Sequence, residues 1–156
     1  MSVNQVYQNF IWRIENTIPD YSVTRNKFRQ IERPIDYSAD RSKGMTRTFS
    51  VSWGGSDIDL DMTDITQRTA DHQFTIEIYY SADYPMDVLH RLVLDDRDKL
   101  IKILRDTDYY VGYNDSNGDT DIGLLYRIRT SDELVEASDV TFMLRMSWTC
   151  TILETE

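Results

Sequence analysis

The segment VTFMLRMSWTCTI, residues 140–152, decides the fold class of this 156-residue chain. Alternation of apolar and polar side chains with a period of two places one side of a strand in a core and the other toward water or a partner. At about 3.3 Å per residue the segment would span roughly 43 Å, longer than most strands of small domains, and such a strand suits a protein that assembles. The apolar side comprises Val140, Phe142, Leu144, Met146, Trp148, Cys150 and Ile152.

Two helices and three further strands follow from the periodicity of apolar residues elsewhere in the chain. Pro19 ends the first helix and Pro85 opens the second, while residues 131–139 are interpreted as a connection. The sequence therefore predicts an α+β fold in the order α-β-β-α-β-β, with a mainly antiparallel sheet of four or more strands packed by two helices. The predicted elements are a helix over 3–18, strands over 47–53 and 73–81, a helix over 86–105, and strands over 123–130 and 140–152.

The pattern allows two C-terminal ends for the strand predicted over 47–53. Phe49, Val51 and Trp53 are expected to share its core side, and Gly54–Gly55 to end it. Residues 57–62 continue the alternation, so they either extend the sheet beyond the glycines or form an exposed turn.

The composition fits one globular domain, which we expect to span residues 1–156. No stretch approaches the ~20 apolar residues of a membrane span, so no membrane partner is expected. The N-terminal segment lacks the pattern of a signal peptide, and the single Cys150 cannot form an internal disulfide, which favours a reducing cytoplasm. The net charge of −10 argues against a general nucleic-acid binder, because such proteins neutralise phosphates with Lys and Arg.

Residues 20–46 form a long basic excursion of mixed polarity, with one short strand expected near 28–31. Between Thr24 and Arg47, seven basic residues stand against three acidic ones, a net charge of +4 that leaves −14 for the rest of the chain. Either this segment docks on an acidic surface of a neighbouring subunit, or it is a solvated loop whose charges keep it soluble.

Three apolar side chains lie outside the predicted core. Trp12 lies nearly opposite the apolar stripe of the first helix, where it is either an interface anchor or covered by the following loop. Leu94 and Ile101 lie off the core stripe of the second helix, so they either pack under a loop or form a second contact surface. The candidate subunit interface therefore comprises Trp12, Arg25, Lys27, Arg29, Arg33, Leu94 and Ile101.

No catalytic, cofactor or metal site is predicted, and the chain is not expected to be an enzyme. The sequence contains no Gly-rich phosphate loop and no nucleophile motif. Cys150 is expected to point into the core, and His72 and His90 to lie on the surface. Residues 115–121 carry Asp and Asn at alternate positions like a calcium loop, but Gly118 is misplaced and the late Glu is missing, so we interpret them as a turn.

The chain resembles the tail terminator proteins of long-tailed bacteriophages, also called tail-completion or minor tail proteins. The resemblance lies in the size, the acidic balance and the order of the predicted elements. Its most suggestive part is the closing segment, where Gly123 to Arg129 is followed by Ala137, Ser138 and Asp139 and then by the alternating strand.

The resemblance implies a structural virion protein of the phage tail or neck, assembled in the host cytoplasm. Six copies would form a ring that ends the tail tube protein's tube and offers its other face to the head-completion or neck protein, while DNA passes through an acidic lumen without specific binding. One alternative is another neck or tail component, such as a head-completion adaptor or a tail tube subunit. The other is a small bacterial ligand-binding domain or enzyme, which would carry a deep pocket.

Overall fold

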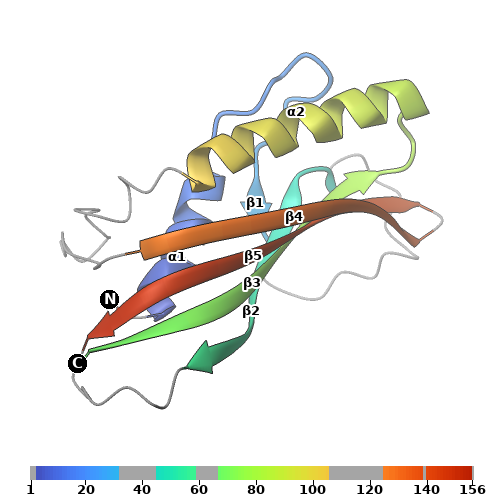
Figure 1. Cartoon of the computed structure of the whole chain (residues 1–156). Coiled ribbons are helices and arrows are strands. Elements are labelled where there is room, and N and C mark those ends of the chain that lie inside the picture. The colour runs from blue at the N-terminus through green and yellow to red at the C-terminus, as the bar shows by residue number, and fades with distance from the viewer. Residues whose placement is uncertain (1–2, 32–44, 59–66, 106–124, 139, 156) are drawn as a thin grey trace.

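The computed structural model describes residues 3–31, 45–58, 67–105, 125–138 and 140–155, which form two helices and one five-stranded sheet (Figure 1). The strand order in the sheet is β1-β2-β3-β5-β4, in which β1 pairs parallel to β2 and all other neighbours pair antiparallel. The elements are α1 (Val3–Glu15), β1 (Arg29–Gln30), β2 (Thr48–Ile58), β3 (Gln67–Ser81), α2 (Met86–Leu104), β4 (Leu125–Ser138) and β5 (Thr141–Thr155).

The α+β class and the two helices are confirmed, whereas the predicted order and sheet type are only partly correct. Strand β1 confirms the short strand expected near 28–31; it makes the observed order α-β-β-β-α-β-β, and its parallel pairing makes the sheet mixed. Helix α2 matches its prediction closely, with Pro85 at its N-cap and Arg105 at its C-cap. Helix α1 ends at Glu15, earlier than the proline signal indicated, and the Thr17 hydroxyl donates to the Arg13 carbonyl at 2.8 Å.

Three strands run further than their predicted segments: β2 and β4 continue past their expected ends, and β3 begins at Gln67, before the expected start at residue 73. Residues 131–138 belong to β4, which pairs with β5 from Leu125 opposite Ile152 to Ser138 opposite Thr141. Their polar side chains are tolerated because β4 is an edge strand of the sheet. Strand β2 continues past its glycines through a bulge, where Gly55 has a φ of 131°, so the sheet extension is confirmed as far as residue 58.

Both helices cover the same face of the sheet and enclose the main core. Phe10 of α1 lies edge-on to Phe74 of β3, with ring centroids 5.2 Å apart, and 6.0 Å from the ring of Trp148. The predicted core sides of 73–81 and 140–152 are confirmed, apart from a half-buried Phe142. Members from the two helices are Val6, Phe10, Ile14, Leu89, Leu92, Val93, Leu100 and Leu104.

The other face of the sheet carries no helix and is mainly polar; we call it the open face. Along β3 and β5 it presents Thr75, Glu77, Arg145 and Ser147, which alternate with the core residues. At one end this face is covered by a small apolar cluster of Met45, Tyr79 and Met143, packed by Ile31, Val135 and Ala137. The open face is therefore closed at one end and accessible along the rest of the described strands.

Candidate interaction surface

Arg47 is the centre of a buried polar network on the helix-covered side of the sheet. Its side chain is fully buried, and its Nε and Nη2 atoms donate to the two carboxylate oxygens of Asp96, each at 2.9 Å. The hydroxyl of Tyr80 donates to the same carboxylate at 2.9 Å. One bidentate ion pair thus joins Arg47, the residue just before β2, to the middle of α2, with Tyr80 near the end of β3 as third partner.

The remaining donors of Arg47 bind the backbone that follows α1. Nη2 donates to the Asp20 carbonyl at 2.8 Å, and Nη1 donates to the Asn26 carbonyl at 2.9 Å and the Thr24 carbonyl at 3.4 Å. Because a guanidinium has five N–H groups, these bonds and the two to Asp96 use all of them. The network is therefore satisfied, as a buried charge requires.

The environment of this network shifts the acid–base properties of two of its members. Burial raises the pKa of the Asp96 carboxyl, while the hydrogen bonds and charge of Arg47 act in the opposite direction. Burial raises the pKa of Tyr80 well above its usual value, and the negative charge of Asp96 adds to the effect. Tyr80 therefore stays protonated at neutral pH and remains the donor in its hydrogen bond.

The backbone at Arg47 is strained. Its φ of 69° lies in the left-handed region, which costs a residue with a side chain on the order of 1–3 kcal/mol. Its N–H still donates to the Tyr79 carbonyl at 2.8 Å, and its carbonyl accepts from Arg29 at 3.1 Å. The hydrogen bonds at both ends of the residue hold this conformation in place.

The result is a tethered stretch of chain, residues 16–31, which we call the clamped segment. Besides the Arg47 bonds, Lys99 donates to the Ile18 carbonyl at 3.5 Å, and the Asn26 amide donates to the Thr46 carbonyl at 3.2 Å. In Figure 1 this blue loop rises past α2 and returns to β1. Before β1 the segment is irregular in secondary structure but fixed at several points along its length.

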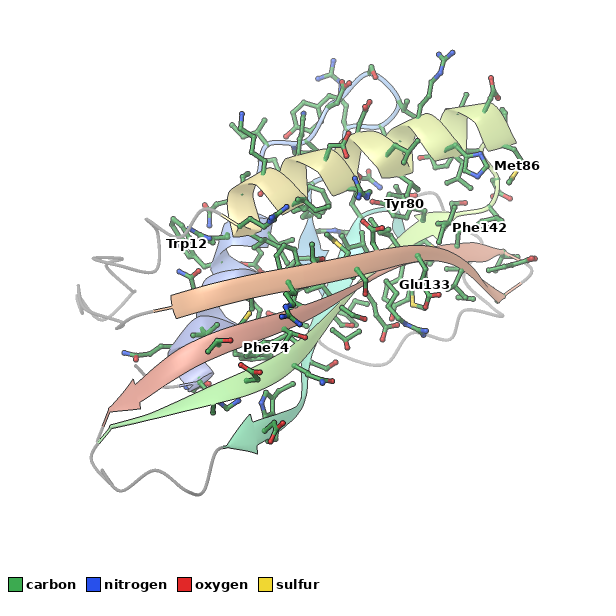
Figure 2. All side chains as sticks on the ribbon, in the orientation of Figure 1. Trp12, Phe74, Tyr80, Met86, Glu133 and Phe142 are labelled. Atoms are coloured by element: carbon green, nitrogen blue, oxygen red, sulfur yellow. The ribbon has the colours of Figure 1, made fainter. Side chains whose placement is uncertain are left out.

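The clamped segment runs beside α2 toward the N-terminal end of that helix. Just before it, Arg13 of α1 donates to the Ile103 carbonyl at 2.9 Å. The next contact joins Ile18 to Lys99, and the one after it joins Asp20 to Asp96 through Arg47. Each contact therefore lies about one helical turn closer to the N-terminal end of α2 than the one before it. Figure 2 shows Trp12, on the last turns of α1, near the C-terminal end of α2.

Apolar side chains are exposed along this path. Ile18 is 75% exposed and Trp12 is 44% exposed, and Tyr21 and Val23 are also exposed. These four make up most of the exposed large hydrophobic side chains in the described part of the chain, the others being Trp53, Met86 and Leu94. All four lie within residues 12–23, and a group of exposed apolar side chains so close along the chain is a candidate interaction surface.

The structure distributes the sequence-predicted interface residues unevenly. Trp12 is exposed, and Arg25, Lys27 and Arg29 are exposed on the clamped segment, close to the apolar group along the chain. Arg33 lies outside the described residues. Leu94 is exposed on α2, whereas Ile101 is half-buried and packs against the main core.

Arg47 had been counted among the surface charges of the basic excursion, and its burial corrects that interpretation. Sequence reasoning missed its network with Asp96 and Tyr80 as well. One signal was present: Asp96 falls within the apolar stripe of α2, between Val93 and Leu100, and a carboxylate in such a position needs a buried partner. Nothing local in the sequence identifies that partner, because Arg47 is 49 residues away.

Other predictions about candidate chemistry had mixed outcomes. His72 is buried within β3, where its Nδ1 accepts a 3.2 Å hydrogen bond from the indole of Trp53, so the prediction of a surface residue is wrong. Trp53 was expected in the core but is half exposed, because it lies on the edge of the sheet beside the bulge. His90 is exposed as predicted.

Cys150 is buried as predicted, and burial raises its pKa to about 12. Residues 115–121 lie outside the described part of the chain. Within that part, no cluster of three or more His, Cys, Asp or Glu side chains could hold a metal ion. None of the helices in the described ranges is both long and apolar enough to cross a membrane.

No protein-family model matches the chain, and no curated protein matches it in sequence.

Proposed function

We propose that this chain is a structural assembly protein, specifically a phage tail terminator that forms a ring on the end of the tail tube and joins it to the head or neck. The observation that carries the proposal is the clamped segment, in which a fully buried ion pair binds the backbone that carries exposed apolar and basic side chains. A globular fold gains nothing for its own stability from exposing Ile18 and Trp12. An interface with another protein would bury them.

The asymmetry of the molecule supports a ring over a two-fold dimer. A closed ring requires a heterologous interface, in which one patch binds a different patch on the neighbour. In the clamped segment exposed apolar residues are followed by basic ones, while the open face is polar and carries Asp71, Glu77 and Glu133 beside Arg145. Two dissimilar surfaces on one subunit are what such an interface needs.

The remaining parts of the proposal follow from the resemblance in the arrangement of elements. Six copies form the ring, the tail tube protein binds one side of it, and the head-completion or neck protein binds the other. The net charge of −10 suits a lumen through which DNA slides without specific binding, because like charges do not adhere. The protein acts mechanically and performs no catalysis.

The proposal is tested by mixing the purified chain with the tail tube protein of the same phage and measuring tube length by negative-stain electron microscopy. A terminator caps the tubes, so the mean length falls as the ratio of chain to tube protein rises, and a ring is visible at one end. If the chain itself elongates into tubes, it is a tube subunit. Unchanged tube length with no end density would contradict the proposal.

A further inference from the structure

We propose that the clamped segment, together with Trp12, is the surface by which each copy of this chain binds the next copy. The inference rests on the proposed ring and names the surface and the partner within it. Its apolar part is Ile18, Tyr21, Val23 and Trp12, and its basic part is Arg25, Lys27 and Arg29.

The surface is preorganised before any partner arrives. Arg47 binds the carbonyls of Asp20, Thr24 and Asn26, and the Asp20 carboxylate accepts a 2.8 Å hydrogen bond from the backbone N–H of Ser22. These bonds fix the backbone on both sides of Tyr21 and Val23. Association therefore does not have to order a flexible loop, a cost that otherwise reduces affinity.

The composition of the surface fits a protein partner. Protein interfaces combine an apolar centre with a polar rim, and aromatic residues and Arg are enriched in them. Ile18 is the most exposed large apolar side chain of the described residues, and an aliphatic group of this kind has no stacking partner in a nucleic acid. A protein surface can offer apolar contacts to the exposed hydrophobic residues and carboxylates close to the basic ones.

Charge complementarity selects a second copy of the chain as that partner. The clamped segment contains three basic residues and one acidic residue, within a chain whose net charge is −10, so the rest of each copy is strongly acidic. On the open face Asp57, Asp71, Glu77 and Glu133 outnumber Arg129 and Arg145, although Glu133 already pairs with Arg145. This face lies on the other side of the sheet from residues 16–26, which are bound beside α2. Electrostatic attraction between unlike surfaces then orients neighbouring copies head to tail.

The first test compares the concentration at which assemblies dissociate, measured by light scattering, for the wild type, the double variant Ile18→Ser/Tyr21→Ser and the control Leu94→Ser. Leu94 is 55% exposed on α2 and lies outside the proposed surface, so it controls for the loss of an exposed apolar side chain. We expect the dissociation concentration of the double variant to be at least about tenfold higher than that of the wild type. The dissociation concentration of the control should differ from that of the wild type by less than about twofold. Below the dissociation concentration, where each protein is a monomer, all three should share one thermal midpoint, because the substituted residues are on the surface and assembly no longer adds to stability.

The second test measures alkylation of Ile18→Cys and Leu94→Cys. The natural Cys150 is buried and does not compete. Assembly should slow the alkylation of Ile18→Cys by about tenfold or more and leave that of Leu94→Cys unchanged. The charge variant Arg25→Glu/Lys27→Glu should dissociate more readily, and this effect should shrink at high salt.

The outcomes separate this inference from the proposed function. If the wild type assembles and the double variant assembles equally well with no protection of Ile18→Cys, the surface is wrong while the ring stands. If the wild type remains monomeric both alone and with tube protein, then a second copy is not the partner of this surface. The proposed ring is contradicted as well. If a DNA duplex protects Ile18→Cys and a second copy does not, a nucleic-acid surface replaces the one inferred here.

Discussion

The two faces of the sheet each carry an arginine–carboxylate pair, but in very different surroundings. On the helix-covered side, Arg47 and Asp96 are fully buried and share further bonds with Tyr80 and three carbonyls. On the open face, Arg145 donates to Glu133 at 3.1 Å, with side chains 40% and 59% exposed. An exposed pair is screened by water and stabilises the fold by little, whereas losing one member of a buried pair leaves an uncompensated charge. The same chemistry is therefore structural on one face and replaceable on the other.

The largest expected effect is that of Arg47→Ala. This change leaves the Asp96 carboxylate buried without its partner and releases the clamped segment, so the free energy of unfolding should fall by about 3–5 kcal/mol in urea titrations. The apolar double replacement Arg47→Met/Asp96→Leu removes both charges, so its free energy of unfolding should fall by less than that of Arg47→Ala. A loss below about 1 kcal/mol for Arg47→Ala would contradict the role assigned to the network.

Two adjacent tyrosines sharpen the comparison, because their hydroxyls lie on opposite faces. The Tyr80 hydroxyl donates to buried Asp96 at 2.9 Å, and the Tyr79 hydroxyl donates to Glu77 at 3.3 Å on the open face. A hydrogen bond to a buried charge stabilises more, so Tyr80→Phe should lower the free energy of unfolding by about 1.5–3 kcal/mol. Tyr79→Phe is the matched control and should cost less than about 1 kcal/mol. Equal losses would show that the two faces do not differ as described.

Smaller effects are expected for the exposed ion pairs. Arg97 of α2 pairs with Asp132 of β4, and both side chains are partly exposed. Asp132→Ala should cost at most about 1 kcal/mol, and Glu133→Ala on the open face about 0.5 kcal/mol or less. Both losses should shrink in high salt, because water and ions screen these pairs. Chemical denaturation with urea at low and high salt measures this, and a loss of several kcal/mol for Glu133→Ala would break the comparison.

Cys150 gives an effect that appears only at high pH. Its pKa is about 12 in the folded chain and 9.0 for an exposed thiol, so between these values the folded state keeps a proton that the unfolded state releases. The contribution of the thiol to stability is therefore constant below about pH 9 and declines as the pH rises toward 12. The raised pKa of Tyr80 lowers stability at high pH in the same direction. Subtracting the stability of Cys150→Ala from that of the wild type at each pH leaves only the contribution of the thiol. Profiles that stay parallel up to pH 12 would mean that the thiol is not buried in solution.

Sequence reasoning recovered the parts of the fold that depend on local periodicity. The alternating segment at 140–152 and the helix over 86–105 both carry patterns that a single element satisfies by itself, and both were placed almost correctly. The second half of β4 was missed because Ser131, Asp132 and Glu133 have no strand-like apolar pattern. Only pairing with β5 makes them a strand.

The candidate surface was recovered in part. Trp12 and the basic residues of the excursion were identified from the helical period and the charge count, and the structure places Arg25, Lys27 and Arg29 on the exterior. The clamp itself was not predicted, because it joins residues 20–26 to Arg47 and Asp96 through contacts distant in sequence. The left-handed backbone at Arg47 also has no glycine or asparagine to signal it.

The most direct test of the account is the solution mass of the purified chain, measured by light scattering over a range of protein and salt concentrations. The account predicts a discrete closed assembly near six copies, formed alone or on addition of tube protein, that loosens as salt screens the basic residues of the clamped segment. A monomer at every concentration, with and without tube protein, would contradict it.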